Sequence, residues 1–189
     1  MLNGAELIVP AILQPMEYTF TLKYRLAEQH SDPDDWIERL GQAGCTDALV
    51  GIGQPGRLAL EFTRDGASAL DALHSALADV KKAIPTARLI EAAPDFVGLT
   101  DIAGIMGVSR QNLRKLMLAH AGSFPPPVHE GSASIWHLAE VLDWLSARGG
   151  YPLERSVLET AKVAREVNLA RQVRQLPARI AGDLERLIA

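Results

Sequence analysis

The sequence predicts an α+β protein, because segments typical of strands and segments typical of helices follow one another in two successive parts. Residues 17–93 combine short segments that have apolar residues at every second position with longer segments that have them at every third or fourth position. Residues 97–148 contain two short helical patterns on either side of Gly107, then a run of prolines and a third helical pattern. Residues 152–189 are largely helical in pattern, so we expect a helical tail there.

The first part is expected to hold four strands and two helices. The clearest strand is residues 17–25, where aromatic and leucine side chains at every second position, from Tyr18 to Tyr24, would share one face. Turn and capping residues predict the other elements in the order helix 33–41, strand 47–52, strand 57–63, helix 65–83 and strand 87–92. This β-α-β-β-α-β order is the ferredoxin-like pattern, in which two helices cover one face of a sheet and leave the other face open.

The open face of such a sheet has several uses, and the pattern does not choose among them. We consider dimerisation, small-ligand sensing and docking of another protein. The glycines between positions 51 and 56 are interpreted as a hairpin turn, because the segment lacks the Lys-Ser/Thr of a phosphate-binding loop and leads into a strand. Pro94 and Asp95 are expected to begin a linker to the second part.

The second part opens with a helix-turn-helix pattern. Apolar residues at positions 99, 102, 103 and 106 mark a first helix, Gly107 ends it, and Val108 is expected to fill the gap between the helices. Ser109 is a candidate N-cap for a second helix. That helix is predicted to run from Arg110 to about Ala119, with positions 113, 116 and 117 facing inward.

The outward face of the second helix carries basic and amide side chains. Arg and Lys can donate to guanine or to phosphates, and Gln and Asn match the adenine edge, so the helix has the layout of a recognition helix. An ordinary solvated helical hairpin is the alternative for this pattern taken alone. The residues predicted to approach bases are Gln111, Arg114, Asn112 and Lys115; those predicted at the phosphates are Arg110 and Thr100, with Ser109 at the start of the helix.

A two-stranded wing and a third helix are predicted next. The prolines at positions 125–127 block a helix, and residues 128–130 and 133–136 can pair as a hairpin around Gly131 and Ser132. The third helix is expected over about 137–147, with an apolar stripe at positions 138, 141, 142 and 145.

Residues 99–145 resemble the excisionase and AlpA-like regulators, a branch of the MerR-type winged helices. The resemblance rests on the following residues in their order and spacing: Val108-Ser109, Phe124-Pro125, Pro127-Val128, Gly131, Trp136, Glu140-Val141 and Trp144-Leu145. It implies that the second helix enters the major groove of DNA and that the wing contacts the backbone. Wings of that family usually carry basic residues, whereas this one reads His-Glu-Gly-Ser-Ala-Ser. The wing here either braces the fold or contacts DNA weakly through Ser132 and Ser134.

The charge of the chain is unevenly distributed. Residues 1–95 hold 8 Lys and Arg against 14 Asp and Glu, a net charge of −6, and residues 96–189 hold 11 against 9, a net charge of +2; together they give the total of −4. The acidic charge therefore lies away from the predicted DNA-binding part, and it favours a protein partner over an anionic ligand for the first part. A net charge of +2 predicts modest non-specific affinity for DNA.

The remaining features point to a protein of the reducing cytoplasm. Cys45 is the single cysteine, so no intramolecular disulfide forms, and it is expected to be a small buried residue. No apolar run approaches about 20 residues. Residues 1–16 lack the basic segment of a signal peptide. Because Met16 directly precedes a predicted strand, they are expected to form a disordered or loosely packed leader, which is either a natural extension or an addition to the natural start. The tail is expected to form helices over about 152–176 and 178–188, separated by Pro177.

These observations predict a sequence-specific DNA-binding transcriptional regulator of bacterial or phage type. It would bind double-stranded DNA as a homodimer, with the acidic first part available for a protein partner. The alternative is a protein–protein interaction module or an antitoxin-like accessory protein without catalytic activity. No catalytic, metal or cofactor motif is present in the sequence, so we expect neither an enzyme nor a bound cofactor.

Overall fold

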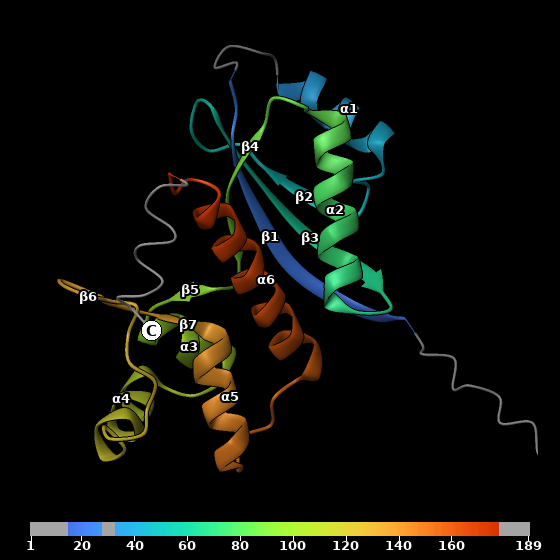
Figure 1. Cartoon of the computed structure of the whole chain (residues 1–189). Helices are drawn as coiled ribbons and strands as arrows, with labels where there is room; N and C mark the ends of the chain where they lie inside the picture. Colours follow the sequence, from blue (N-terminus) through green and yellow to red (C-terminus); the bar gives the residue numbers. More distant parts are fainter. Residues whose placement is uncertain (1–14, 28–32, 178–189) are drawn as a thin grey trace, which may run out of the picture.

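The computed structural model describes residues 15–27 and 33–177 and has the predicted α+β class. Within these residues, helices and two antiparallel sheets form two neighbouring parts (Figure 1). Residues 1–14 of the leader predicted over 1–16, the cap at Ser31 and the helix predicted over 178–188 lie outside the described residues. Met16, the last residue of that predicted leader, is instead the first residue of a strand.

The first part is built on a four-stranded sheet in which all neighbours are antiparallel. Its strands are β1 (Met16–Arg25), β2 (Ala48–Gly51), β3 (Arg57–Gly66) and β4 (Arg88–Ala93), in the order β2-β3-β1-β4. Residues Tyr18 to Tyr24 alternate between buried and solvent-accessible positions, as the sequence predicts, because every second side chain points to the same face. Phe20 stacks on Phe62 of β3, with ring centroids 5.3 Å apart, at the centre of this core.

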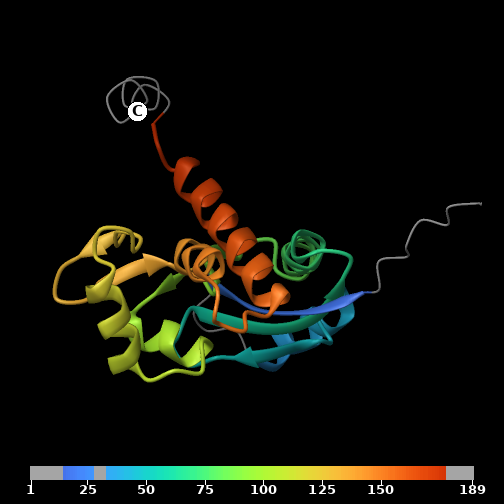
Figure 2. The same cartoon turned by 90° about the horizontal axis from the view of Figure 1, so that it is seen from below.

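Three helices pack beside one another in this part, where the sequence predicted two. They are α1 (Pro33–Ala43), α2 (Ala69–Ala83) and α6 (Arg155–Val173), and α2 lies between the other two (Figures 1 and 2). The third helix is the predicted tail. Val163 and Ala164 of α6 belong to the core under the sheet, whereas Ala161 belongs to the core of the second part. The short side chains at these positions let α6 approach both hydrophobic cores, so this one helix packs against both parts of the protein.

The start of α2 differs from the sequence prediction. The strand β3 does not end at Thr63 but continues to Gly66, because its pairing with β1 runs without interruption to Met16 opposite Gly66. A Cβ atom at Gly66 would lie 2.9 Å from the Ser68 carbonyl oxygen, so this close approach requires glycine. The helix begins at Ala69, and the hydroxyl of Ser68 caps it by accepting the N–H of Asp71 at 3.1 Å.

The second part contains a small three-stranded sheet and three helices. The strands are β5 (Phe96–Val97), β6 (His129–Glu130) and β7 (Ser134–His137), in the order β5-β7-β6. The helices are α3 (Leu99–Ile105), α4 (Arg110–Ala119) and α5 (Leu138–Arg148), close to their predicted bounds. The sequence did not predict β5, because two residues are too few to show a period. Val97 pairs with Trp136 and so joins the start of this part to the β6–β7 hairpin.

The segment at Pro94 and Asp95 is a buried junction, so the prediction of a linker was wrong. Asp95 is fully buried, and its carboxylate lies 2.7 Å from Nδ1 of His137 and accepts the side-chain amide of Asn168 at 2.8 Å. Asn168 also bonds both the N–H and the C=O of Ala92 at 2.8 Å. The main-chain carbonyl of Asp95 accepts the N–H of Leu138 at 2.7 Å. These contacts join β4, α5 and α6 at one point.

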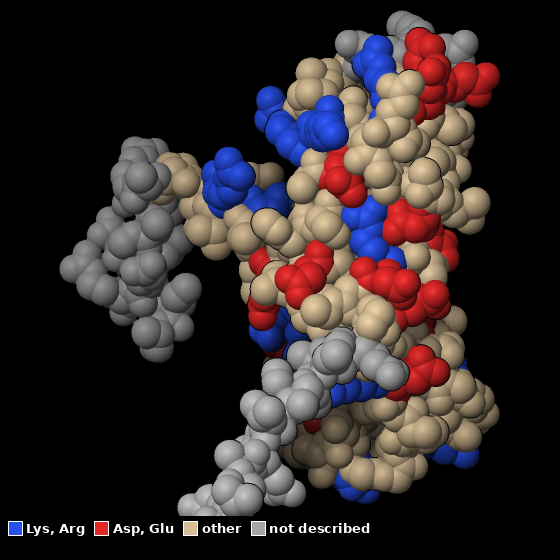
Figure 3. Space-filling model, turned by 90° about the vertical axis from the view of Figure 1, so that its right-hand side faces the viewer, with Lys and Arg blue, Asp and Glu red and all other residues tan. Residues whose placement is uncertain are grey.

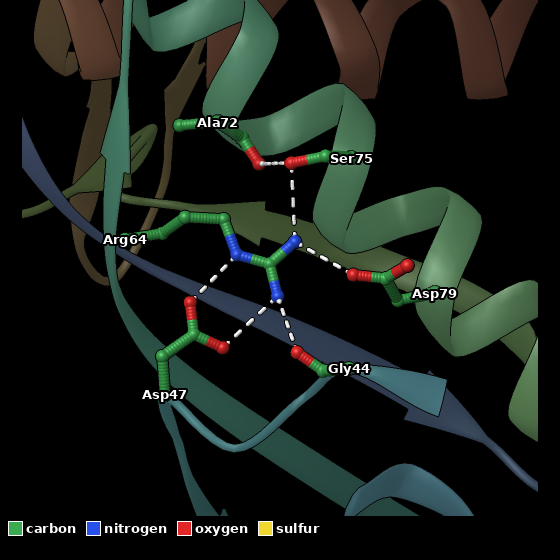
Figure 4. A network of polar contacts seen from close by, with 6 residues as sticks. All are labelled: Gly44, Asp47, Arg64, Ala72, Ser75 and Asp79. Carbon is green, nitrogen blue, oxygen red and sulfur yellow. Dashed lines mark hydrogen bonds and ion pairs between the residues drawn. The ribbon is translucent and has the colours of Figure 1, made fainter. Parts of the chain in front are cut away.

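A second polar network fastens α2 to the edge of the sheet (Figure 4). The guanidinium of Arg64 donates to both carboxylate oxygens of Asp47, at 2.6 and 2.9 Å, and to Asp79 on α2 at 2.9 Å. It also donates to Ser75 and to the carbonyl of Gly44. The planar guanidinium suits such a site, because its donors point in fixed directions toward several acceptors at once.

The single cysteine is buried, as predicted. Cys45 belongs to the core under the sheet and is 4% exposed, and burial raises the pKa of its thiol to about 11. At neutral pH it therefore stays a protonated, unreactive packing residue.

We predict that Asp47→Asn destabilises the protein at pH 7 by about 1–2 kcal/mol, because a charge-assisted bidentate pair is lost. The hydrogen bonds from Arg64 lower the pKa of Asp47 below its usual value of 3.8. The ionised carboxylate therefore stabilises the folded state above pH 4, and this contribution is lost as the pH falls through the lowered pKa.

Urea unfolding at pH 7 and at pH 3 measures this contribution. The difference in free energy of unfolding between the parent and Asp47→Asn should shrink at the lower pH. Glu166→Gln, which removes an exposed carboxylate with no ion pair among the described residues, is the matched control and should change little. An unchanged difference at the two pH values would contradict the assignment.

Candidate nucleic-acid interface

The turn between α3 and α4 is short and well defined. Gly107 has a φ angle of 63°, a left-handed conformation that suits the residue just after a helix. The N–H of Val108 then bonds the carbonyl of Ala103 at 3.0 Å, and Val108 packs against the core between the helices, as predicted. Ser109 caps α4, and its hydroxyl accepts the N–H of Asn112 at 3.2 Å.

The helix α4 presents a polar, cationic face to solvent. Leu113 is buried and Leu116 and Met117 are half-buried, so the predicted inward positions are confirmed. The helix contains no acidic residue. Its exposed polar side chains are those that the sequence singled out: Arg110, Gln111, Asn112, Arg114 and Lys115.

Aromatic side chains brace the predicted wing. The indole N–H of Trp136 donates to the carbonyl of Pro125 at 3.1 Å, and the rings of Trp136 and Phe124 meet edge to face with centroids 6.2 Å apart. The ring of Phe124 also meets that of Trp144 of α5, with centroids 5.2 Å apart. The N–H of Val128 bonds the carbonyl of Ile135 at 2.8 Å, which extends the β6–β7 hairpin. The proline run is thus held between the hairpin and the core.

A groove of about 890 Å³ lies between α4, the start of α3, the proline run and the β6–β7 hairpin. It brings together residues that are up to 38 positions apart in the chain, from Gly98 to Trp136. Five of the nine predicted DNA-binding residues line it: Thr100, Arg110, Arg114, Ser132 and Ser134. In both ribbon views α4 and the hairpin lie at the end of the molecule away from α1 (Figures 1 and 2).

The other four predicted residues lie on α4 outside the lining of the groove. Gln111, Asn112 and Lys115 are exposed on the helix surface, where they can reach a ligand larger than the groove. Ser109 is exposed, but its hydroxyl is engaged in the cap of α4.

The groove also has apolar walls, which the sequence did not predict. Met117, Leu118 and the prolines at positions 125–127 line it, and Leu118 is 61% exposed. The signal for Leu118 was its spacing of four from Arg114, which places both on one side of the helix. Glu130 lines the hairpin side, and Asp101 lines the α3 side, where its carboxylate accepts the N–H of Gly98 at 2.8 Å.

The visible charge distribution follows the uneven charge of the sequence. On the face drawn in Figure 3, most of the visible carboxylates lie over the upper and middle parts of the molecule, where Lys and Arg side chains lie among them. The lower end, at the height of α4 and α5 in Figure 1, carries basic side chains along its margin. An anionic partner would therefore be repelled less at this end.

Among the described residues, no three His, Cys, Asp or Glu side chains lie together in a way that could hold a metal ion. No helix in the same part of the chain is long and apolar enough to span a membrane. No protein-family model matches the chain, and no curated protein or solved structure is significantly similar to it.

We predict that Trp136→Phe lowers the free energy of unfolding by about 1–3 kcal/mol, because it removes the hydrogen bond to Pro125 and part of a buried ring. Trp144→Phe is the matched control, since Trp144 is only half-buried and no hydrogen bond of its indole is present in the described part of the chain. Urea unfolding followed by far-UV circular dichroism compares the two, and a larger loss for Trp144→Phe would contradict this role of Trp136.

Proposed function

We propose that this protein is a sequence-specific DNA-binding regulator of transcription that reads DNA with α4. The observation that carries the proposal is the groove between α4 and the β6–β7 hairpin. A cationic helix face without acidic residues and a hairpin from a distant segment there form one concave surface. A helix of this kind fits the major groove of B-DNA, which is about 12 Å wide.

The fold interpretation supports this proposal. We assign residues 97–148 as a winged helix-turn-helix, with α3 and α4 as the helix pair, β6 and β7 as the wing and α5 as the third helix. We assign residues 17–93 as a ferredoxin-like domain, whose strand order β2-β3-β1-β4 agrees with that pattern. In this scheme the sheet domain serves dimerisation or binds a partner, and the tail helix α6 joins the two units.

The residues of α4 divide into two roles in the proposed complex. Arg114 and Gln111 approach base edges, with Asn112 and Lys115 beside them, because their side chains leave the exposed side of the helix. Arg110 and Thr100 lie nearer the start of each helix and hold phosphates. The hairpin has no Lys or Arg, so Ser132 and Ser134 add only neutral hydrogen bonds and α4 supplies most of the affinity.

We predict that the protein binds a preferred duplex more tightly than an unrelated one and that affinity falls with salt. One phosphate contact, by Arg110, in each copy of a dimer gives a slope of log K against log salt of about −2. Fluorescence anisotropy on duplexes enriched from a random-sequence pool, across a salt series, measures both quantities.

Arg114→Ala should weaken binding to the preferred duplex by about 5- to 150-fold, which corresponds to about 1–3 kcal/mol for one arginine–guanine pair. Arg39→Ala is the matched control, because Arg39 is an exposed arginine of α1, at the other end of the molecule. If Arg114→Ala binds every duplex as tightly as the parent protein does, Arg114 does not read bases.

A protein partner in the same groove is the second candidate function, and the exposed Leu118, which lines the groove, favours it. An apolar wall of this kind suits a peptide or helix from another protein. Absence of any salt-sensitive DNA complex, together with loss of partner binding in Leu118→Asp, would select this alternative.

A further inference from the structure

Among the described residues, no helix packs flat on the other face of the four-stranded sheet (Figures 1 and 2). At its β1 margin, Thr19, Thr21 and Glu61 line a pocket of about 510 Å³ together with Ile105 of α3 and residues 152–154. The side chains of this face alternate with the buried residues of the same strands, so β1 contributes residues 17, 19, 21, 23 and 25 and β3 contributes residues 57, 59, 61, 63 and 65. Most of these side chains are exposed, and Leu49 of β2, on the same face, is 73% exposed.

The charges on this open face are sorted by position along the strands. Arg25 and Arg57 lie directly opposite each other at one end, and Glu17 and Asp65 lie directly opposite each other at the other end. The two pairs are eight residues apart on each strand, which is about 26 Å. One end of the open face is therefore basic and the other end is acidic.

Like charges in directly opposed positions destabilise a sheet, so these pairs cost stability in the isolated chain. None of the four side chains makes an ion pair within the described part of the chain. The residues between the two ends are mostly small or uncharged. Thr19 faces Thr63, and Thr21 pairs with Ala93 on β4, whereas Lys23 is neutralised by Glu91 at 2.9 Å.

We propose that the open face of the sheet is the contact surface between two copies of this chain, related by a twofold axis that runs across the strands. This axis reverses the strand direction between the copies, so the Arg25 and Arg57 end of each copy lies over the Glu17 and Asp65 end of the other. The like-charged pairs then lie opposite unlike charges across the contact between the two sheets.

The same geometry places Glu61 close to the axis. Glu61 is halfway between Arg57 and Asp65 on β3, so the two copies of Glu61 face each other. Glu61→Gln removes this repulsion and should tighten the dimer. If the contact were only a general attraction between an acidic and a basic surface, removal of an acidic residue would weaken the dimer. The twofold arrangement predicts the opposite for Glu61→Gln, so this variant distinguishes the two.

Charge reversal tests the surface directly. Arg25→Glu with Arg57→Glu makes both ends acidic, and Glu17→Arg with Asp65→Arg makes both ends basic. Each double variant should be monomeric in sedimentation velocity, with the dimer weakened at least tenfold. An equimolar mixture of the two should form a heterodimer, because every contact is then between opposite charges. Arg39→Glu with Lys82→Glu, on helices outside the open face, is the control of equal charge change and should remain dimeric.

A parent protein that stays monomeric at about 100 μM would overturn the proposal, since a contact that weak is not a specific dimer. The proposal would also be overturned by double variants that remain dimeric, by a mixture that stays monomeric, or by a Glu61→Gln variant with a weaker dimer.

The inference deepens the proposed function as a regulator by naming its dimer surface. Because the experiment uses no DNA, its failure is distinguishable from a failure of DNA binding.

Discussion

The buried contact of Asp95, His137 and Asn168 determines how the two parts of this protein are held together. All three side chains are buried, and Asp95 and Asn168 are fully so. A buried carboxylate is stable only when its oxygens are satisfied, and here one faces the imidazole of His137 while the other accepts the amide of Asn168. Because these partners come from α6 and from the end of β7, the chain cannot satisfy Asp95 unless both parts are folded and docked.

This constraint connects the two proposed functions of the molecule. The open face of the sheet belongs to the first part, and α4 belongs to the second. A dimer formed through the sheet therefore sets the distance between its two α4 helices only if the two parts of each copy are rigidly joined. Asn168 supplies that joint by bonding both main-chain groups of Ala92 at the outer side of β4. The helix α6 completes it by contributing to both hydrophobic cores.

The sequence predicted the elements whose signals are local. The turn at Gly107, the cap at Ser109 and the bounds of α4 all follow from a few neighbouring residues, whereas the nine candidate DNA-binding positions stay a prediction. It did not predict β5, the place of α6 against the sheet or the role of Asp95, because each depends on residues far apart in the chain. Asn168 is 73 positions from Asp95, and nothing near either residue indicates the partner. The groove likewise exists only once the hairpin folds back beside α4.

Native-state hydrogen exchange in Asn168→Ala tests the central claim that the two parts form one cooperative unit. Removal of Asn168 leaves the main-chain groups of Ala92 and one oxygen of Asp95 without their partners, at a cost of about 3–5 kcal/mol. The account predicts that the slowest amides of β3, such as Leu60, and of α5, such as Leu142, lose the same free energy of protection. Loss of protection in α5 with β3 unchanged, or the reverse, would show two independent units and would contradict it.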